Sequence, residues 1–425
     1  MTNTWKKYLF GALVIACIAA TALLFLPEQQ ADDPATHDSD VSAPPAVPIA
    51  PTAPTDAPET AVSEKATGAD WNTYHGDNAL RGVTQWPLPD EMVVRWHLMT
   101  GAPVRVPPVA HDGIIFAATT RGEIIAADLE GREIWRRELT APAPGHDLPQ
   151  PVYIDAPITA VNGKVFLGTD LGDVFALRAD TGEELWRANI GGPVRGAPNY
   201  NSAGNRIFVI EQDLGALVCL DVDSGAEVWR SDGVDRSDGS PAIAEDVAVF
   251  GSCASALHVV AIATGERLRD IPIANGGGQV AGGVALVDGF AYAGVRDGRI
   301  MRGDVAEGAF TWITGISEDE VFATPAVHDA WVVATSYDGR VHALHRETGE
   351  IQWQHDLQGK PSSPIIADDR IIVAADGALF LLRLEDGKRV WEQRLSDEIT
   401  GPAILPDMVV VGSEDGVITA LGPPD

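Results

Sequence analysis

The chain has 425 residues, of which 45% are hydrophobic, 43 are Gly and 29 are Pro, and its formal net charge is −31. This length and apolar content suffice for a large core, and an all-β propeller of this size can form one unit. The acidic balance argues against nucleic acid as a partner, because phosphate binding needs a basic patch. Three Cys offer neither a disulfide framework nor a metal-ligand spacing.

Residues 1–27 place Lys6 and Lys7 before an apolar run over 8–26. At 1.5 Å per residue this run nearly crosses a bilayer core of about 30 Å. The basic pair places the N-terminus in the cytoplasm. The pattern predicts an uncleaved anchor, which would hold a periplasmic protein at the inner membrane. A cleaved signal peptide and a lipoprotein on Cys17 are alternatives. All three export the rest of the chain.

Residues 28–69 are dominated by Pro, Ala, Thr and Asp and lack aromatic side chains. Such a segment cannot bury enough apolar area to offset the entropy lost on ordering. We expect a disordered, semi-extended linker between the N-terminal segment and a folded part over 70–425.

The folded part repeats with a period of about 40 residues, which indicates a repeat architecture. A Trp recurs near this spacing, with one double step whose midpoint carries Arg269. Its positions are Trp96, Trp135, Trp186, Trp229, Trp312, Trp353 and Trp391. We interpret these Trp as packing residues that dock each unit on the next. The turn Thr181-Gly182 before Trp186 exemplifies the tight turn that precedes the Trp strand.

Each unit reads as four short β-branched strands joined by Gly and Asp-Gly turns, which is typical of propeller blades. The strand that follows a Gly turn occurs eight times, at residues 122, 172, 215, 255, 298, 339, 377 and 416. The last copy lacks a Trp strand, and the Trp strand around Trp96 precedes the first unit. We therefore expect an all-β, eight-bladed propeller in which the N-terminal strand completes the last blade and removes an open edge.

The pattern A-x-D-x-x-T-G-x-x-x-W resembles the tryptophan-docking repeat of quinoprotein-type (PQQ-like) propellers. Ala176, Thr181, Gly182 and Trp186 match it, with Arg178 in the Asp place. The entry segment DWNTYHGDNALRGV also resembles the leader before such propellers. The likeness covers residues 70–425. Its two relevant branches are the pyrroloquinoline-quinone dehydrogenases and the non-catalytic propellers similar to the outer-membrane assembly factor BamB. Fold alone does not decide between them.

The dehydrogenase branch implies an adjacent Cys-Cys pair over the quinone and a Glu, Asn and Asp around Ca²⁺. Cys219 and Cys253 are not adjacent, and no such oxygen trio stands out. A disulfide between these two Cys remains open. No CxxCH haem motif or nucleophile elbow is present either. We therefore expect no enzyme activity, no cofactor and no metal. An atypical quinoprotein dehydrogenase and a ligand- or polysaccharide-sensing propeller are the alternatives.

The BamB branch implies a protein-contact rim. Counting three residues before each blade-opening Pro, or before Gly283 in the one blade that lacks this Pro, predicts a ring near the central channel: Arg105, Ile154, Arg195, Asp238, Val280, Phe322, Pro361 and Ile399. The stretches PVRGAP and VDRSDGSP resemble the partner-gripping loops of BamB. By that resemblance the partner-binding residues are Arg105, Arg195, Asp235, Arg236 and Asp238. The alternative is that Arg195 and Asp238 pair with each other across blades.

The longest inter-blade insertion carries His146 and Asp147. We interpret it as a surface loop, with a partner contact or a metal site as alternatives. The sequence therefore predicts a membrane-tethered, monomeric propeller that works within a larger envelope complex by contacting protein partners.

Overall fold

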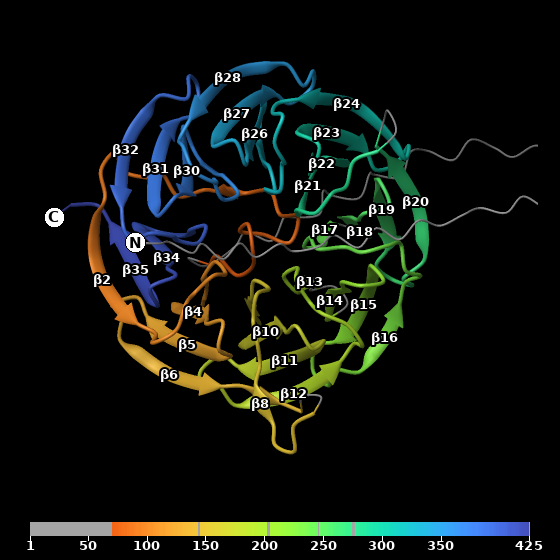
Figure 1. Ribbon diagram of the computed structural model, residues 1–425, viewed down its shortest axis with the longest axis vertical. Coiled ribbons are helices and arrows are strands. Elements are labelled where there is room, and N and C mark those ends of the chain that lie inside the picture. The colour runs from red at the N-terminus through yellow and green to blue at the C-terminus, as the bar shows by residue number, and fades with distance from the viewer. Residues whose placement is uncertain (1–69, 143–144, 202–204, 245, 274–276, 425) are drawn as a thin grey trace, which may run out of the picture. The chain divides into compact units, whose positions relative to one another are not determined.

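Strand pairing arranges the described residues into eight blades around a central axis, each a sheet of four antiparallel strands, to one of which a short parallel strand is added (Figure 1). The computed structural model describes residues 70–424 except 143–144, 202–204, 245 and 274–276. Every regular element in this part is a β-strand. The all-β, eight-bladed propeller is therefore confirmed.

Contacts divide the chain into Met1–Ser63 and Glu64–Asp425, and the described residues all belong to the second unit. The predicted anchor over 1–27 and linker over 28–69 lie outside the described residues. Among the residues that are described, no helix long and apolar enough to cross a membrane is found.

Blades 1 to 4 run from the innermost to the outermost strand in chain order. They are β3 (Val109–His111), β4 (Ile114–Ala118), β5 (Glu123–Asp128), β6 (Glu133–Glu138); β9 (Thr159–Val161), β10 (Lys164–Gly168), β11 (Asp173–Arg178), β12 (Glu184–Asn189); β13 (Asn199–Asn201), β14 (Arg206–Glu211), β15 (Ala216–Asp221), β16 (Glu227–Arg230); and β17 (Ala242–Ala244), β18 (Val247–Gly251), β19 (Ala256–Ala261), β20 (Arg267–Pro272).

Blades 5 to 7 continue this order. They are β21 (Val284–Val287), β22 (Phe290–Val295), β23 (Arg299–Asp304), β24 (Ala309–Gly315); β25 (Ala326–His328), β26 (Trp331–Ser336), β27 (Arg340–His345), β28 (Ile351–Asp356); and β29 (Ile365–Ala367), β30 (Arg370–Ala375), β31 (Ala378–Arg383), β32 (Arg389–Arg394). A short strand, β1 (Val83–Thr84), pairs in parallel with β29. A separate hairpin, β7 (Thr140–Ala141) and β8 (Gln150–Pro151), stands between blades 1 and 2.

Blade 8 joins the two ends of the described chain. Its inner strands are β33 (Ala403–Leu405), β34 (Met408–Gly412) and β35 (Val417–Gly422), and its outermost strand is β2 (Val93–Met99). The antiparallel pairing of β2 with β35 runs from Val93–Gly422 to Met99–Val417. The predicted closure is thus present, and each of the eight described blades has its fourth strand (Figure 1).

One contact repeats between consecutive blades. The indole Nε1 of Trp186 donates to the carbonyl of Val222 in the next blade at 2.8 Å, and its ring covers Gly225 in the turn that follows β15. Six Trp repeat this arrangement, with donor–acceptor distances of 2.8–3.1 Å: Trp96, Trp135, Trp186, Trp229, Trp312 and Trp353. A Cβ on each covered glycine would lie closer than 3.0 Å to the ring. The turn glycine and the Trp of the preceding blade therefore form one unit.

Blade 4 shows what replaces the Trp. Arg269 occupies the Trp place on β20, and its aliphatic stem lies over Gly308 of blade 5, with Cδ 3.2 Å from where a Cβ would stand. A long side chain can cover the glycine with its methylenes while its charged end stays in water.

The segment 70–84 before the first blade, here called the leader, runs through the centre of the propeller (Figure 1). Its carbonyl oxygens accept hydrogen bonds from innermost-strand N–H groups of six blades, at 2.7–2.9 Å; the donors are Ala110, Ala160, Ile243, Leu286, Val327 and Ile366. In blade 3, the Asn199 side chain donates to Asn78 O instead, at 2.7 Å. Leu80 is fully buried within this ring. The leader therefore satisfies backbone donors that would otherwise be unpaired around the channel.

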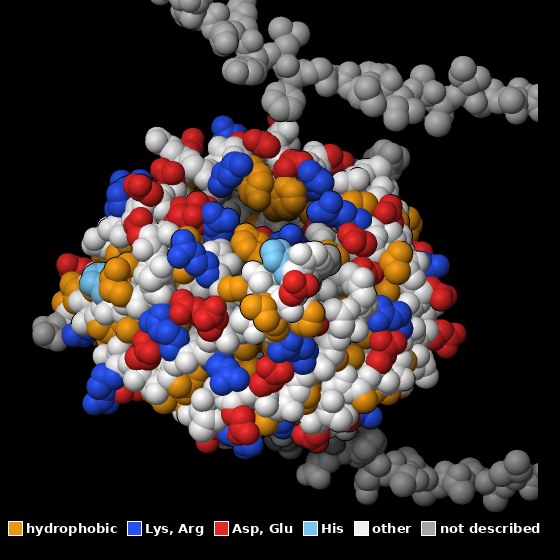
Figure 2. Space-filling model, turned by 60° about the horizontal axis from the view of Figure 1, so that its bottom comes forward, with side chains coloured by type: hydrophobic (Ala, Val, Ile, Leu, Met, Phe, Trp, Pro, Cys, Tyr) orange, Lys and Arg blue, Asp and Glu red, His pale blue; other side chains and the backbone are white. Residues whose placement is uncertain are grey.

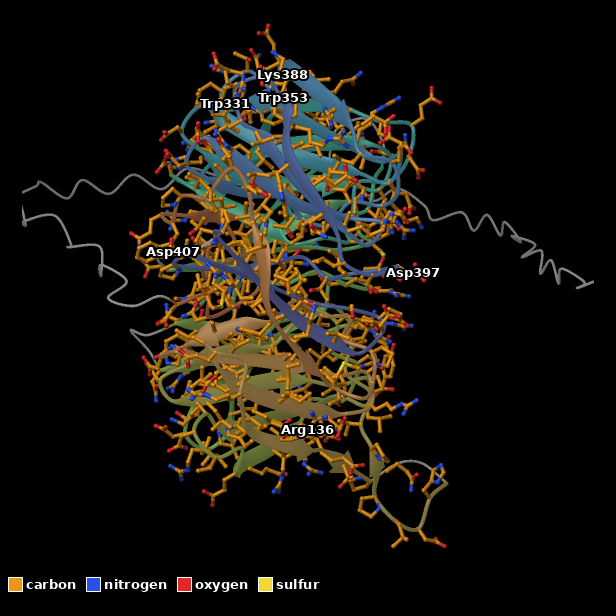
Figure 3. All side chains as sticks on the ribbon, turned by 90° about the vertical axis from the view of Figure 1, so that its left-hand side faces the viewer. Arg136, Trp331, Trp353, Lys388, Asp397 and Asp407 are labelled. Carbon is orange, nitrogen blue, oxygen red and sulfur yellow. The ribbon has the colours of Figure 1, made fainter. Side chains whose placement is uncertain are left out.

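The propeller has two faces. The turn face carries the first and third turns of each blade, such as 112–113, and the loop face carries the second turns and the inter-blade connections. Figure 3 shows Asp407 on the turn face and Asp397 on the loop face, at opposite ends of the strands. The hairpin of β7 and β8 projects on the loop-face side (Figure 3).

The Trp–Gly contact predicts that Gly→Ala substitution lowers the free energy of unfolding more at a glycine under a Trp than at an uncovered glycine. Gly225 (φ 69°) lies under Trp186, whereas Gly163 (φ 68°) has no atom within 4 Å of the place where a Cβ would stand. Both Gly→Ala changes meet the left-handed backbone cost of about 1–2 kcal/mol. Only Gly225→Ala also meets the indole, which adds about 1–3 kcal/mol. Denaturant unfolding of the two variants measures the difference; equal losses would contradict this role of the Trp contact.

Candidate functional site

The loop face carries a rim of ion pairs around the channel. Arg105 makes two hydrogen bonds to the Glu414 carboxylate, from Nε and Nη2, each at 2.7 Å, and Nη1 lies 3.4 Å from Tyr153 Oη. The hydrogen bonds from Arg105 hold the pKa of Glu414 below its usual value. Arg105 is about half exposed. It joins blade 8 to the connection that enters blade 2.

Arg195 pairs with Asp155, with Nη1 2.9 Å from Oδ2. Both side chains are roughly one third exposed, at 32% and 39%. The pair links the connections that enter blades 2 and 3. The alternative drawn from the sequence, in which Arg195 pairs with Asp238, is replaced by this contact with the preceding connection.

The connection between blades 3 and 4 carries the other three predicted contact residues. Arg236 donates from Nε and Nη2 to Asp238 Oδ1, at 3.1 and 3.0 Å, and Asp238 also accepts a hydrogen bond from Gln212. The bond to Asp238 raises the pKa of Arg236. Asp235 is exposed and has φ 112°, a conformation that costs a non-Gly residue free energy. This strained, charged loop lies on the same face as Arg105 and Arg195.

Three residues of the predicted ring are buried. Ile154 and Val280 are each 1% exposed, and Pro361 is buried as well. Val280 packs over Gly251 as Val194 packs over Gly168. Arg105 and Arg195 each follow a buried valine, Val104 and Val194. In the same way Asp155 follows buried Ile154 and lies beside Arg195, so counting from Pro157 misplaced this rim position by one. A buried aliphatic residue directly before the rim residue is the sequence signal that would have found Asp155.

A second sector of the loop face is aromatic. The rings of Phe322 and Tyr337 stack with centroids 4.9 Å apart. Arg296 covers Phe322 at 5.0 Å, and the Lys360 ammonium covers Tyr337 at 4.8 Å. Burial raises the pKa of Tyr337. Each ring of this stack therefore contacts both the other ring and a cation.

The cavity beside the leader is small. It has a volume of about 180 Å³ and is lined mainly by Trp71, Tyr74, His75, Ile365 and Pro402. Pockets for drug-sized ligands measure about 300–1,000 Å³. Tyr74 Oη is already bonded to Thr324 and Ser363, and both His75 nitrogens face carbonyl oxygens. The polar groups of the leader that line this cavity are thus already hydrogen-bonded within the propeller.

The two cysteines of the described part do not form a disulfide. Cys219 is buried in β15, where desolvation raises its pKa to about 12, and Cys253 is partly exposed beside Arg236. A vicinal disulfide over a quinone is therefore absent at these positions.

A serine, a histidine and an aspartate form a hydrogen-bonded series in blade 4. Ser252 Oγ lies 2.8 Å from His258 Nε2, and His258 Nδ1 lies 2.8 Å from Asp270 Oδ1. The spacing resembles a hydrolytic triad, but Ser252 has no exposed surface, so no substrate carbonyl can reach its hydroxyl. Ser252 Oγ also accepts the N–H of Ala254. These hydrogen bonds stabilise a turn. The series could not be predicted from the sequence, because the register of the strands brings the three residues together.

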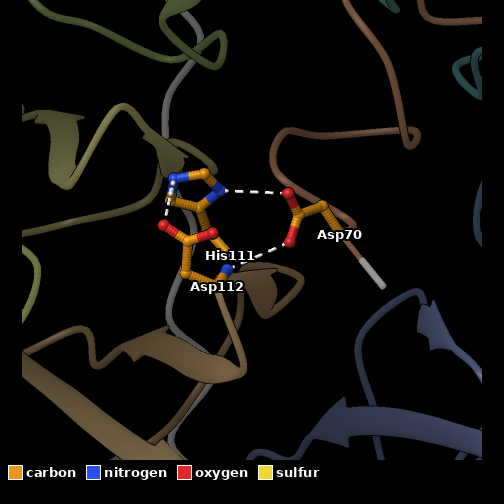
Figure 4. A group of neighbouring side chains, drawn as sticks. All are labelled: Asp70, His111 and Asp112. Atoms are coloured by element: carbon orange, nitrogen blue, oxygen red, sulfur yellow. Dashed lines mark hydrogen bonds and ion pairs between the residues drawn. The ribbon is translucent and has the colours of Figure 1, made fainter. Parts of the chain in front are cut away.

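Asp70, His111 and Asp112 gather at the turn face, where the leader begins (Figure 4). His111 Nδ1 lies 3.2 Å from Asp70 Oδ2, and Nε2 lies 3.3 Å from Asp112 Oδ2. Asp70 Oδ1 accepts the Asp112 N–H at 3.0 Å. Both oxygens of Asp70 are thus engaged in fixing the leader to the first turn of blade 1. His146 and Asp147, the other candidates for a metal, are exposed on the hairpin.

Buried His342 in β27 predicts a pH dependence of stability. It has no exposed surface, and desolvation lowers its pKa to about 4. The unfolded chain binds a proton near pH 6.5 while the folded chain does not. Stability is therefore complete above pH 6.5 and falls as the pH drops toward 4, by about 3 kcal/mol for this residue.

His342→Gln should remove this share of the pH dependence, measured by denaturant unfolding at pH 7 and pH 4. His146→Gln, on the exposed hairpin, is the control and should leave the dependence unchanged. Identical pH profiles for wild type and His342→Gln would show that His342 titrates normally.

Acidic and basic side chains are interspersed over the surface seen in Figure 2, so no single-sign field covers it. The contact residues predicted from the sequence, Arg105, Arg195, Asp235, Arg236 and Asp238, all lie on the loop face. They form separate local pairs rather than one cluster. Such a rim suits geometrically specific polar recognition.

Comparisons with known proteins agree with this architecture. A family model described as "Outer membrane protein assembly factor BamB" matches residues 131–355 and 338–425. The protein of that name from Moranella endobia is 22% identical over 284 residues, which span 63% of this chain and 71% of the relative. The crystal structure of BamB from Moraxella catarrhalis superposes with a TM-score of 0.66 at 20% identity, over 78% of this chain and all of that one.

A quinohemoprotein alcohol dehydrogenase from Comamonas testosteroni has a TM-score of 0.67 at 13% identity, over 84% of this chain and 81% of that one. At these identities the structural likeness shows the propeller fold alone, which BamB shares with an alcohol dehydrogenase.

Proposed function

The chain belongs to the BamB family of outer membrane protein assembly factors, and from this premise we propose that it is a non-catalytic scaffold of the cell envelope. It acts by presenting the loop face of a rigid propeller to protein partners of an outer-membrane assembly complex. It works as a monomeric propeller in the periplasm, held at the inner membrane by residues 8–26, and it needs neither metal nor cofactor.

The observation that carries this proposal is the rim of exposed guanidinium–carboxylate pairs, Arg105–Glu414, Arg195–Asp155 and Arg236–Asp238. Exposed pairs of this kind contribute little to stability. They are nevertheless held in defined geometry by short connections between packed blades. A partner that replaces water around such groups gains charge-assisted hydrogen bonds with a fixed orientation.

A comparison with the alternative supports the same conclusion. A dehydrogenase needs a cofactor site, and the channel is filled by the leader. The buried Ser252 offers no route for hydrolytic chemistry.

The rim can be tested by affinity purification of the intact, membrane-solubilised protein from its own envelope. Arg195→Glu should lower recovery of an outer-membrane assembly component at least about tenfold, which corresponds to about 1.4 kcal/mol. Arg389→Glu is the matched control, because Arg389 forms an exposed ion pair with Glu392 on the outermost strand β32.

The double variant Arg195→Asp/Asp155→Arg distinguishes binding from a purely structural role. It keeps the ion pair but exchanges its two charges on the rim. Loss of the partner with unchanged thermal stability would support the proposal. Retention of the partner by both Arg195→Glu and the exchanged pair would show that this rim pair does not bind.

A further inference from the structure

Three Asp-Leu dipeptides lie on the loop face over one sector of the propeller. Asp147-Leu148 is in the hairpin between blades 1 and 2, Asp170-Leu171 is in the β10–β11 turn, and Asp213-Leu214 is in the β14–β15 turn. The exposed fractions of the leucines are 74%, 38% and 64%. We call these six residues the Asp-Leu sector.

The position of these leucines is unusual within the described residues. All other large hydrophobic side chains that are exposed there lie on the outermost strand of a blade: Val93, Val94, Met99, Ile134, Val228, Leu268, Phe310 and Ile351. Only the three leucines of the sector are exposed in turns or connections. They share one face and belong to consecutive parts of the ring. Exposed apolar side chains gathered in this way mark interaction surfaces.

Two of the aspartates beside the leucines are available to a partner. Within the described part of the chain, Asp147, Asp170 and Asp213 form no ion pair. Asp147 and Asp213 are exposed, whereas Asp170 Oδ1 is buried and lacks a hydrogen-bond partner among the described residues. The carboxylates of Asp147 and Asp213 can therefore receive a basic group beside Leu148 and Leu214.

The turns that present the sector are preorganised. The buried Glu211 carboxylate accepts the N–H groups of Asp213 and Leu214, at 3.1 and 2.9 Å. In the other turn, Thr169 Oγ1 accepts the N–H of Asp173 at 3.1 Å. The base of the hairpin is fixed by a bond from Val152 N to Leu139 O. Presenting side chains on fixed turns lowers the entropy lost on binding.

We propose that the Asp-Leu sector binds a basic amphipathic helix of a partner protein, whose apolar stripe contacts the leucines and whose flanking Lys or Arg meet the aspartates. This inference rests on the proposed scaffold function and adds the chemistry of a partner segment. The choice of a basic partner follows from the exposed carboxylates of the sector and the net charge of −31. Helices of this kind recur as ligands of apolar surfaces.

The test uses the full chain and a defined probe. The probe is a fluorescent peptide of Leu and Lys only, with Leu at the spacing i, i+3, i+4 and i+7. Its controls are a scrambled peptide of the same composition and a peptide with Glu in place of Lys. Binding is measured by fluorescence anisotropy over a range of salt concentrations. We expect binding of the amphipathic Lys peptide at least tenfold tighter than that of either control.

The triple variant Leu148→Gln/Leu171→Gln/Leu214→Gln should weaken binding of the Lys peptide at least tenfold. The matched variant Ile134→Gln/Val228→Gln/Leu268→Gln, on outermost strands, should leave it unchanged. Asp147→Asn/Asp213→Asn should weaken binding and reduce its salt dependence. Equal losses in the two triple variants, or equal binding of the three peptides, would overturn the proposal.

Failure of this inference and failure of the proposed function are distinguishable. If Arg195→Glu loses the envelope partner while the sector leucine triple retains both partner and peptide, the scaffold function stands and the sector proposal is overturned. If the leucine triple loses both and the rim variants lose neither, the sector proposal stands and the rim assignment fails.

Discussion

The packing of six Trp, each over the turn glycine of the next blade, is the contact on which the propeller depends. It fixes two things at once, because the ring excludes any side chain from the glycine and its N–H satisfies a backbone carbonyl at the same turn. The hydrogen bond sets the angle of the ring, and the ring sets the distance between blades. Repeated around the circle, this contact places the connections on the loop face in a common frame, so the rim is a consequence of blade packing.

The β2–β35 pairing and the leader stabilise different parts of the propeller, the last blade and the centre. The pairing of β2 with β35 removes the open sheet edge in the last blade. The leader lies at the centre, where the innermost strands of the blades converge. The N–H groups on the inner edges of these strands have no neighbouring strand to bond to. By lying across these donors the leader completes their hydrogen bonding.

The sequence allowed the repeat, the blade count and the closure to be predicted, because each follows from local signals: a Trp, a Gly turn and an unmatched strand at either end. It also placed Arg105, Arg195, Asp235, Arg236 and Asp238 in loops of one face. It did not reveal that Arg195 pairs with Asp155, since the connection before blade 2 is displaced by one residue in the frame. The Ser252–His258–Asp270 series and the Phe322–Tyr337 stack also escaped it, because both arise from strand register and blade packing. Contacts of this kind have no signature in spacing along the chain.

The leader also determines how the propeller would carry a mechanical load. Asp70 is fixed to His111 and Asp112 at the turn face, so a pulling force applied through the chain upstream enters the disc on the side opposite the rim. The force then meets hydrogen bonds from several innermost strands along the channel before it can reach the β2–β35 seam at the periphery. Tension is thereby shared among blades near the axis, and the seam that holds the ring closed is shielded from it.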